Sequence, residues 1–504
     1  MINLPVGISA LAVSFPSIIR TNDYWQQKFP ELVAQTQPTR TRLPRNITFT
    51  SDHQDLDIWS QEVAPYLSDP FRGNVERRVL ASEESSFTLE GRAARDVLSA
   101  AKFSPEQVEL MMVASLFPEQ IGPGHAVCLA RQLELNCPAW NLESTCSSAL
   151  VALQNACALV RTGEYRNVLV VVSQIGSNSV DEQDTLSWSM GDGAGAFLVS
   201  SLKSNQGILA SKIVHTAATC GAYLHKLVTD EQDKPRLRTR TGENASTLAE
   251  TAVEFVRNCC EGAMAKAGVT LEQINFFAFN TPTPWYANVC RRALGIAPER
   301  TINLYPRYAN IGPVLPLANL YHAAIADKIH ENDLVLVYTN GATATAAATV
   351  MRWGEVPLGP EPAPPISITE GEEEITISSE EVLTTEIIFF TREELLTTAL
   401  EEWQQKLENY LLKWLAISLQ QPLTNLHSQQ SLAPLLDSLM AFELKRRIET
   451  DLQIQVPIEK LFADSNISQL AELLINQLTL ENLINSETDT AENKQAKTRE
   501  KFSL

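Results

Sequence analysis

Four short apolar runs, which form two similar pairs, constrain most strongly how this chain can fold. The runs are residues 110–114, 168–172, 274–279 and 334–338. Runs of this length and composition are typical of strands that are buried on both faces. Helix-forming stretches such as 246–267 and 288–294 lie between them, so the order of elements indicates a layered α/β fold.

The spacing of these runs predicts a duplication. In each pair the second run begins about 60 residues after the first and leads into a segment of small residues. These segments are 191–196 in the first half and 341–346 in the second. Two similar halves predict a duplicated α/β unit with a site between them, although spacing alone leaves chance similarity as the alternative.

Composition divides the chain into four parts, for which we predict the boundaries 1–354, 355–391, 392–481 and 482–504. The second part is rich in proline and carries the acidic run 372–374, so it is predicted to be a linker. A short strand docked on the first domain is the alternative, because isoleucines alternate with polar residues between 366 and 377. The third part has helical spacing and predicts an all-α four-helix bundle, whereas the polar last part predicts a disordered tail.

Charge and composition exclude several classes of protein. A net charge of −20 argues against a nucleic-acid partner, which would need a basic face. No run reaches the roughly 18 apolar residues that cross a bilayer, and the first residues lack a signal-peptide pattern. The eight cysteines show no Cys-x-x-Cys spacing and the seven histidines no paired ligand spacing. We therefore predict a cytoplasmic protein with reduced thiols, no membrane partner and no metal site.

Cys146 is the first candidate for chemistry. It precedes residues 147–160, a segment that is apolar almost all round and predicts a buried helix. A thiol at a helix N-terminus lies at the positive end of the helix dipole, which favours the thiolate. The thiolate is the form that exchanges acyl thioesters. On residue chemistry alone, the alternative is an unreactive cysteine in the hydrophobic core.

Ser438 is the second candidate. It follows Asp437 and begins a short predicted helix near the C-terminus. A serine at a helix N-terminus suits attachment of a phosphodiester, but the same pair of residues is also an ordinary helix cap. The basic residues 445–447 on this helix, flanked by Glu443 and Glu449, form either a docking surface or a solvated face.

Three motifs show that residues 1–354 resemble the β-ketoacyl-acyl-carrier-protein synthase III family, condensing enzymes of the thiolase superfamily. They are residues 143–150 around Cys146, the glycine-rich segment 190–196, and 308–312 followed by 317–320. The resemblance implies a duplicated five-layer α/β/α/β/α fold and a homodimer. It also implies that Cys146 accepts the acyl group, and that Asn310 is a catalytic asparagine.

One position departs from the family pattern. The family's catalytic histidine follows the strand that matches 274–279, and Asn280 stands there in this chain. An asparagine amide donates a hydrogen bond but cannot shuttle a proton near neutral pH, so decarboxylative condensation is in doubt. His125 and His215 are poor substitutes for the missing histidine, and His322 is expected to pack on a helix.

The resemblance also implies an oxyanion hole made of two backbone N–H groups. These belong to Cys146 and Ala342. The segment 340–343 keeps Gly341 but has Ala342 and Thr343 where the family has more glycine. A backbone donor persists in any residue except proline. The changed side chains predict an altered substrate pocket.

Residues 392–481 resemble an acyl or peptidyl carrier domain. The motif 436–440, with 462–464 and Leu470 further on, carries this resemblance. It implies that Ser438 bears a covalent 4′-phosphopantetheine arm, which a phosphopantetheinyl transferase attaches. Acyl-CoA or acyl-carrier thioesters and other biosynthetic modules or carriers are the implied partners.

The two resemblances together predict an acyltransferase or ketoacyl synthase III-like enzyme of polyketide, fatty-acid-like or nonribosomal-peptide biosynthesis. It would move an acyl group through a Cys146 thioester to or from the arm on Ser438. The alternative is a condensation-deficient synthase domain, with Asn280 in place of histidine. Such a domain would act as an acyl gate, a decarboxylase or a binding platform for the carrier.

Overall fold

The structure is a computed structural model of the chain. It describes residues 4–36, 54–120, 124–229, 235–362, 392–419, 423–432, 438–454, 456 and 466–479. The described residues form two compact units, one of residues 4–362 and one of residues 392–479. The boundaries that we predict from composition stay a prediction, and the predicted tail 482–504 lies outside the described residues.

The first unit is built on two mixed sheets. The first has the strand order β1-β7-β6-β4-β5, and the second has the order β11-β12-β13-β8. The strands of the first sheet are β1 (Val6–Ser14), β4 (Leu110–Leu116), β5 (Ala139–Asn141), β6 (Val168–Ile175) and β7 (Asp192–Ser201). Those of the second are β8 (Gly207–His215), β11 (Phe276–Phe279), β12 (Leu334–Asn340) and β13 (Thr345–Arg352).

The two sheets repeat one arrangement of strands, which confirms the predicted duplication. In the first sheet β4 runs parallel to β6, and β7 and β1 follow antiparallel. In the second sheet β11 runs parallel to β12, and β13 and β8 follow antiparallel. The short edge strand β5 is an addition to the first sheet.

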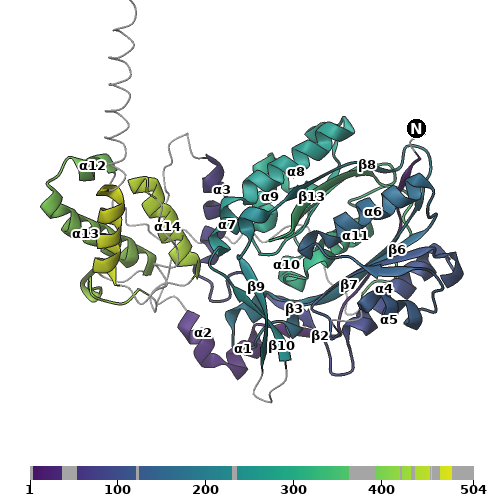
Figure 1. The fold of residues 1–504 in the computed structure, drawn as a ribbon, viewed down its shortest axis with the longest axis horizontal. Helices are drawn as coiled ribbons and strands as arrows, with labels where there is room; N and C mark the ends of the chain where they lie inside the picture. Colours follow the sequence, from purple (N-terminus) through teal and green to yellow (C-terminus); the bar gives the residue numbers. More distant parts are fainter. Residues whose placement is uncertain are drawn as a thin grey trace, which may run out of the picture. The chain divides into compact units, whose positions relative to one another are not determined.

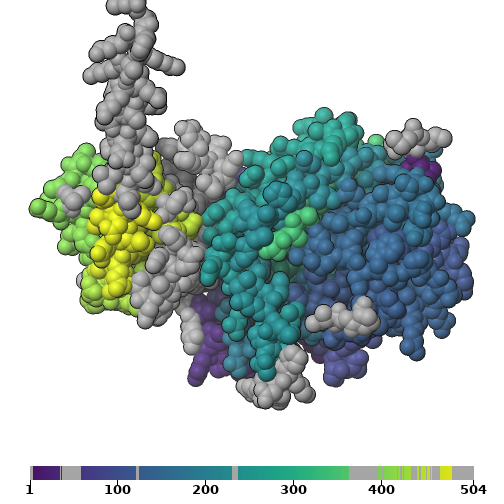
Figure 2. All heavy atoms as spheres, viewed as in Figure 1, coloured from purple at the N-terminus to yellow at the C-terminus, as the bar shows by residue number. Residues whose placement is uncertain are grey.

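Helices complete five layers, as predicted (Figure 1). α4 (Ser86–Ala101) and α5 (His125–Gln132) cover the outer face of the first sheet, and α8 (Ala252–Ala267) and α9 (Tyr286–Leu294) cover the outer face of the second. Between the sheets lie α6 (Ser148–Thr162) and α11 (Leu315–Ile325). The space-filling view shows the blue and teal halves meeting over the face in view (Figure 2).

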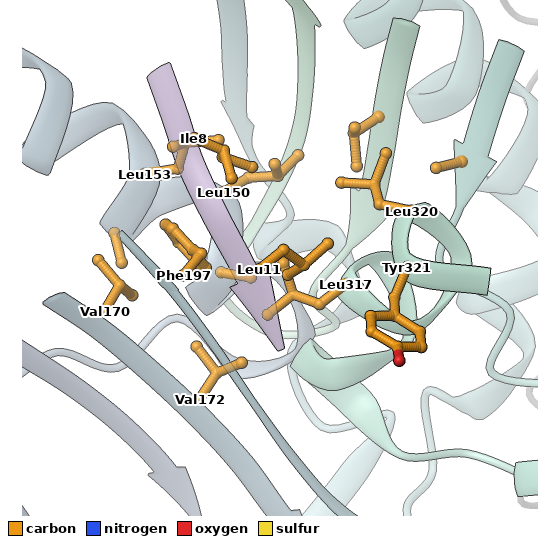
Figure 3. Packing of buried hydrophobic residues seen from close by; sticks show 14 of the residues in the cluster. Ile8, Leu11, Leu150, Leu153, Val170, Val172, Phe197, Leu317, Leu320 and Tyr321 are labelled. Atoms are coloured by element: carbon orange, nitrogen blue, oxygen red, sulfur yellow. The ribbon is translucent and has the colours of Figure 1, made fainter. Parts of the chain in front are cut away.

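The central layer is held by apolar packing (Figure 3). Each fully buried leucine, valine or phenylalanine here contributes about 1.5–3 kcal/mol relative to an exposed side chain. Leucines of α6 and α11 pack with side chains of β1, β6 and β7, namely Leu150, Leu153, Leu317 and Leu320 with Leu11, Val170, Val172 and Phe197. This packing holds α6, which begins two residues after Cys146, against the first sheet.

The structure differs from the predicted elements at three places. The predicted helix 246–267 is interrupted at Thr251, which separates α7 (Ala245–Glu250) from α8. The Thr251 hydroxyl donates to the carbonyl of Thr247 at 2.6 Å, a side-chain bond that competes with regular helix. The strand predicted from residue 274 begins at Phe276, and the helix predicted from residue 288 begins at Tyr286.

The first residues of the predicted linker lie along β1. Leu11 donates its N–H to the carbonyl of Pro357 at 3.0 Å and accepts the N–H of Gly359 at 2.9 Å. The hydroxyl of Tyr321 donates to the carbonyl of Gly359 at 2.9 Å. The described part of this segment, up to residue 362, is therefore ordered against the first unit. The isoleucines that suggested a docked strand lie outside the described residues.

Smaller elements complete the first unit. They are β2 (Ile18–Thr21), β3 (Glu76–Val79), β9 (Tyr223–Thr229), β10 (Pro235–Thr241), α1 (Asp23–Lys28), α2 (Pro30–Thr36), α3 (Gln54–Val63) and α10 (Tyr305–Tyr308). Strands β9 and β10 pair with each other as an antiparallel hairpin. Two single-turn helices matter for the site: η3 (Thr145–Ser147) and η9 (Gly312–Val314).

The second unit is helical, as predicted for a carrier bundle. Its helices are α12 (Arg392–Leu396), α13 (Trp403–Leu419), α14 (Ser438–Leu452) and residues 467–479. Leu407, Leu411 and Leu415 of α13 are buried against Leu444 and Ile448 of α14. No helix in the described parts of the chain is long and apolar enough to cross a membrane.

The basic residues of α14 are engaged within that helix. Lys445 pairs with Glu449 at 3.1 Å, and Arg447 pairs with Asp451 at 2.6 Å. Asp451 also accepts the hydroxyl of Tyr410 at 2.8 Å. These two basic side chains stabilise the bundle through one-turn pairs, which favours the structural interpretation over a free docking surface.

Candidate active site

Cys146 lies in the sharp turn η3, directly before α6. Thr145, the residue before it, has a φ of 48°, a region that β-branched residues rarely adopt. Ala309, the residue before Asn310, also has a positive φ, of 54°. Strained backbone of this kind persists where the surrounding structure fixes it and is frequent at functional sites.

Hydrogen bonds from the second half of the unit fix the turn. The hydroxyl of Ser147 donates to the carbonyl of Thr345 at 2.6 Å and accepts the hydroxyl of Thr339 at 3.0 Å. The hydroxyl of Ser144 lies 2.7 Å from that of Thr345. These contacts join the residues on both sides of Cys146 to β12 and β13, so the duplicated halves meet at the thiol.

The resting thiol of Cys146 is protonated. Burial raises its pKa from 9.0 to about 12, against the opposing effect of its own backbone N–H, and the negative charge of Glu143 adds to the rise. The predicted stabilisation of the thiolate is therefore wrong for the resting site. The reason is that burial of the thiol penalises its charged form more than the backbone hydrogen bond favours it.

Asn280 and Asn310 meet at Gly312. The Nδ2 group of Asn280 donates to the carbonyl of Gly312 at 2.9 Å, and the N–H of Gly312 donates to Oδ1 of Asn310, also at 2.9 Å. Gly312 has a φ of 51°. An added Cβ there would displace the side chain of Gln174, so this position favours glycine.

One residue thus orients two side-chain amides in opposite senses. The N–H of Gly312 holds Oδ1 of Asn310, which leaves the Nδ2 hydrogens of Asn310 as the available donors. The carbonyl of Gly312 holds Nδ2 of Asn280, which turns its Oδ1 elsewhere. Oδ1 of Asn280 is buried, and no donor from the described residues reaches it.

The three predicted site residues are brought together by these elements. η3, with Cys146, packs against η9, which begins at Gly312. Asn280 follows β11, and its N–H donates to the carbonyl of Tyr338 on β12 at 2.8 Å. The next residue of β12, Thr339, contacts the neighbour of Cys146. Two independent routes therefore place Asn280 beside the turn that holds the thiol.

The segment around Ala342 is fixed by side-chain acceptors. The N–H groups of Thr343 and Ala344 donate to the hydroxyls of Thr219 and Thr216 at 2.9 and 3.0 Å. The N–H of Gly341 donates to the carbonyl of Thr345 at 2.8 Å. Within the described residues, the N–H of Ala342 has no such partner. It is thus available as the oxyanion donor that we predict.

The other histidines considered do not replace the missing one. His125 is buried, with Nδ1 2.7 Å from Glu90 and Nε2 3.2 Å from Ser86. Nε2 of His322 lies 2.9 Å from the hydroxyl of Tyr308, and burial lowers the pKa of His322 to about 4. His322 is a buried residue of α11, which agrees with the expected packing on a helix. His215 ends β8, and its ring nitrogen accepts the N–H of Ala217 at 3.4 Å.

Two residues near the thiol are missed by the sequence analysis. Glu143 is exposed, and its carboxylate accepts the N–H of Thr145 at 2.6 Å. Tyr223 begins β9; burial and the nearby Cys146 raise its pKa. An acidic residue in an otherwise small and polar turn was the available signal for Glu143, but only the fold places Tyr223 here.

Ser438 is the first residue of the 15-residue helix α14 in the second unit. The unpaired N–H groups at such a helix start suit a phosphodiester. Asp437 and the predicted motif 462–464 lie outside the described residues. No group of three or more His, Cys, Asp or Glu side chains within the described ranges could hold a metal ion.

Comparisons with family models match three segments. The family model described as 3-oxoacyl-[acyl-carrier-protein (ACP)] synthase III matches residues 140–217. The model of the C-terminal part of that family matches residues 264–353. The phosphopantetheine attachment site matches residues 435–474, which include Ser438. The chain therefore joins both halves of a synthase III-like domain to a carrier domain that holds covalent 4′-phosphopantetheine.

Similar proteins agree with this division. The β-ketoacyl-[acyl-carrier-protein] synthase III of Aquifex aeolicus is 26% identical over 318 residues, 62% of this chain and 98% of that protein. The enzyme of Brucella canis is 28% identical over 325 residues, 62% of this chain and 96% of that protein. Both are similar to the synthase-like domain.

Solved structures confirm the thiolase-like fold. The synthase III of Thermus thermophilus superposes with a TM-score of 0.56 at 25% identity and covers 69% of this chain and 99% of its own. Xanthomonas campestris OleA with bound lauric acid and lauroyl-CoA superposes with a TM-score of 0.55 at 15% identity, covering 69% and 99%. The second likeness concerns the fold alone.

Proposed function

We propose that this chain, a synthase III-like domain joined to a carrier domain, is an acyltransferase that works through Cys146. The acyl group passes from a thioester to Cys146 and then to or from the phosphopantetheine arm on Ser438. The observation that carries this proposal is the turn at Cys146, which both halves of the duplicated unit hold beside Asn280 and Asn310.

Acylation forms a bond between the Cys146 sulfur and the acyl carbon and breaks the bond to the donor thiol. The thiol proton leaves during attack, because burial keeps the pKa of Cys146 high, and the departing thiolate takes it up. The N–H groups of Cys146 and Ala342 would stabilise the tetrahedral oxyanion. Substrates would be acyl-CoA or acyl-carrier thioesters of polyketide, fatty-acid-like or nonribosomal-peptide biosynthesis.

A condensation-deficient domain is the second candidate. Asn280 carries no titratable group, and its Nδ2 is engaged by Gly312. In that case the synthase-like domain would be an acyl gate, decarboxylase or binding platform, and the carrier would be the working part. Transfer to the arm separates the two candidates, because a binding platform forms no acyl-Cys146.

We also propose a cytoplasmic homodimer formed through the synthase-like domain. Trp140 on the edge strand β5 and Val127 on α5 are exposed by 40% and 59%. An edge strand next to apolar side chains is suited to pairing with a second copy. Light scattering of the full chain would give the mass of a dimer, and a monomer would contradict this.

Intact mass of the arm tests the proposed function. The full chain, made with a phosphopantetheinyl transferase, is offered octanoyl-CoA, and the peptide carrying Ser438 is weighed. We expect an octanoyl adduct on the arm of the unaltered protein. Cys146→Ala should keep the arm but lose the octanoyl adduct, whereas Ser438→Ala should lack the arm itself. Cys220→Ala, at an exposed cysteine, is the matched control and should leave the adduct unchanged. An adduct that survives Cys146→Ala would overturn the proposal.

A further inference from the structure

We infer that the acyl group on Cys146 is delivered to an amine, so that the site forms an amide instead of a carbon–carbon bond. This rests on the proposed function and names its acceptor. The observations are the orientation of Asn280 by Gly312 and the carboxylate of Glu143 beside the thiol.

Asn280 presents a hydrogen-bond acceptor to its buried surroundings. Gly312 holds its Nδ2, and no described donor reaches Oδ1. An unsatisfied buried acceptor destabilises the site that holds it. A ligand with an N–H satisfies Oδ1 of Asn280, whereas an enolate oxygen, which only accepts, leaves this atom without a partner. The site around Asn280 therefore favours a protic nucleophile.

Glu143 selects among protic nucleophiles by charge. Its carboxylate is held one residue from Cys146 through the N–H of Thr145, and its charge acts on both Cys146 and His225. A negative charge attracts an ammonium group and repels the free carboxylate of a malonyl thioester. Glu143 therefore concentrates the amine as its ammonium form at the site, and the neutral fraction of the amine attacks.

An amine also fits the absence of a strong base at Asn280. A neutral amine attacks a thioester without first losing a proton, whereas an alcohol needs a general base of suitable pKa. The lowered pKa of His322 and its contact with Tyr308 make that ring a poor base. The acceptor is therefore a primary amine, either free or part of an aminoacyl thioester on the Ser438 arm.

The step balances without a further reactant. The amine nitrogen bonds to the acyl carbon, and the bond from that carbon to the Cys146 sulfur breaks. The N–H groups of Cys146 and Ala342 stabilise the oxyanion, and Asn280 Oδ1 accepts an N–H of the amine. The proton that the nitrogen loses after its attack passes to the Cys146 thiolate as the carbon–sulfur bond breaks. The products are an N-acyl amide and the free thiol.

Competing acceptors test the inference in the full-length holoenzyme. The octanoyl enzyme is offered n-butylamine, 1-butanol or malonyl-CoA, and a second sample carries a glycyl thioester on its arm. We expect octanoyl amide in the presence of butylamine or on the glycyl arm, with little ester or keto product. The two amine samples distinguish a free acceptor from one on the arm.

Variants connect the amide to the two residues. Glu143→Gln should slow amide formation about tenfold or more relative to octanoylation of Cys146, because the charge that concentrates the ammonium is lost. Asn280→His should lower amide and raise keto product. Glu164→Gln and Asn155→His, at exposed positions on or beside α6, are matched controls that should change neither.

Two results would overturn the inference. One is keto product or ester in excess of amide, and the other is an amide rate unchanged in Glu143→Gln. If the octanoyl group reaches Cys146 and the arm but never an amine, the proposed transfer stands and the amine acceptor fails. If Cys146 is not acylated, the proposed function itself fails.

Discussion

The hydroxyl of Thr339 donates to the hydroxyl of Ser147 at 3.0 Å, although 192 positions separate the two residues. Ser147 follows Cys146 directly, and Thr339 is the next-to-last residue of β12. Both side chains are fully buried. One contact therefore joins the nucleophile turn of the first half to the strand of the second, and the duplicated fold makes a single site there.

Thr339→Val should loosen this junction. The valine keeps the shape of the side chain but removes the donor, so we expect a loss of about 1 kcal/mol in the free energy of unfolding and slower octanoylation of Cys146. Denaturant unfolding and intact mass measure the two effects. Thr349→Val removes a hydroxyl 3.0 Å from Ser211 in β13 and β8, and it should cost stability without slowing acylation.

Gly312→Ala should disturb the hydrogen bonds by which Gly312 orients the side chains of Asn280 and Asn310. The new Cβ would displace the carboxamide of Gln174, which donates to the carbonyl of Asn310 at 2.6 Å. Together with the positive φ of 51°, this should loosen both 2.9 Å bonds to Asn280 and Asn310. We expect acyl transfer to fall at least about tenfold, the equivalent of about 1.4 kcal/mol.

Gly295→Ala is the control for backbone strain in that experiment. Gly295 has a φ of 71° and open space around its Cβ position, so alanine there carries only the cost of the left-handed conformation, about 1–2 kcal/mol. Equal losses of transfer in both variants would show that Gly312 matters through stability alone.

The sequence predicts the architecture because the relevant signals are local. The four apolar runs become β4, β6, β11 and β12, and buried strands need only short apolar stretches. The positions of Cys146 and Ser438 at the starts of their helices follow from motifs of a few residues. Element ends were less accurate, as at Thr251, where a single side-chain bond interrupts a helix.

The chemistry of the site could not be predicted, because it depends on contacts between distant segments. Motif matching identifies Asn280 and Asn310, but only the fold shows that Gly312 turns their amides in opposite senses. The pKa of Cys146 depends in the same way on burial, which a dipole argument from the adjacent helix omits.

The raised pKa of Cys146 predicts slow alkylation near neutral pH. Because the folded pKa is about 12, iodoacetamide should modify Cys146 more slowly than the exposed Cys220 at pH 8, as peptide mass spectrometry would show. Glu143→Gln removes a negative charge that raises this pKa, so it should speed alkylation of Cys146 but not of Cys220. An unchanged rate would mean that Glu143 does not act on the thiol.

The same shift links stability to pH on the alkaline side. A folded pKa above the unfolded value means that the contribution of Cys146 is fully present below pH 9.0 and is lost as the pH rises toward about 12. Cys146→Ser should therefore reduce the alkaline loss of unfolding free energy. Burial raises the pKa of Cys157 to about 12 as well. Cys157→Ser should therefore also reduce the alkaline loss of unfolding free energy, although Cys157 has no part in transfer.

His322 should make the first unit sensitive to acid. Burial lowers its pKa from 6.5 to about 4, so the folded state resists a proton that the unfolded chain accepts. The stability that this gives is present above pH 6.5 and is lost as the pH falls through about 4. His322→Gln should flatten the decline in unfolding free energy over that window. A flat profile in the unaltered protein, or an undiminished decline in His322→Gln, would contradict the assignment.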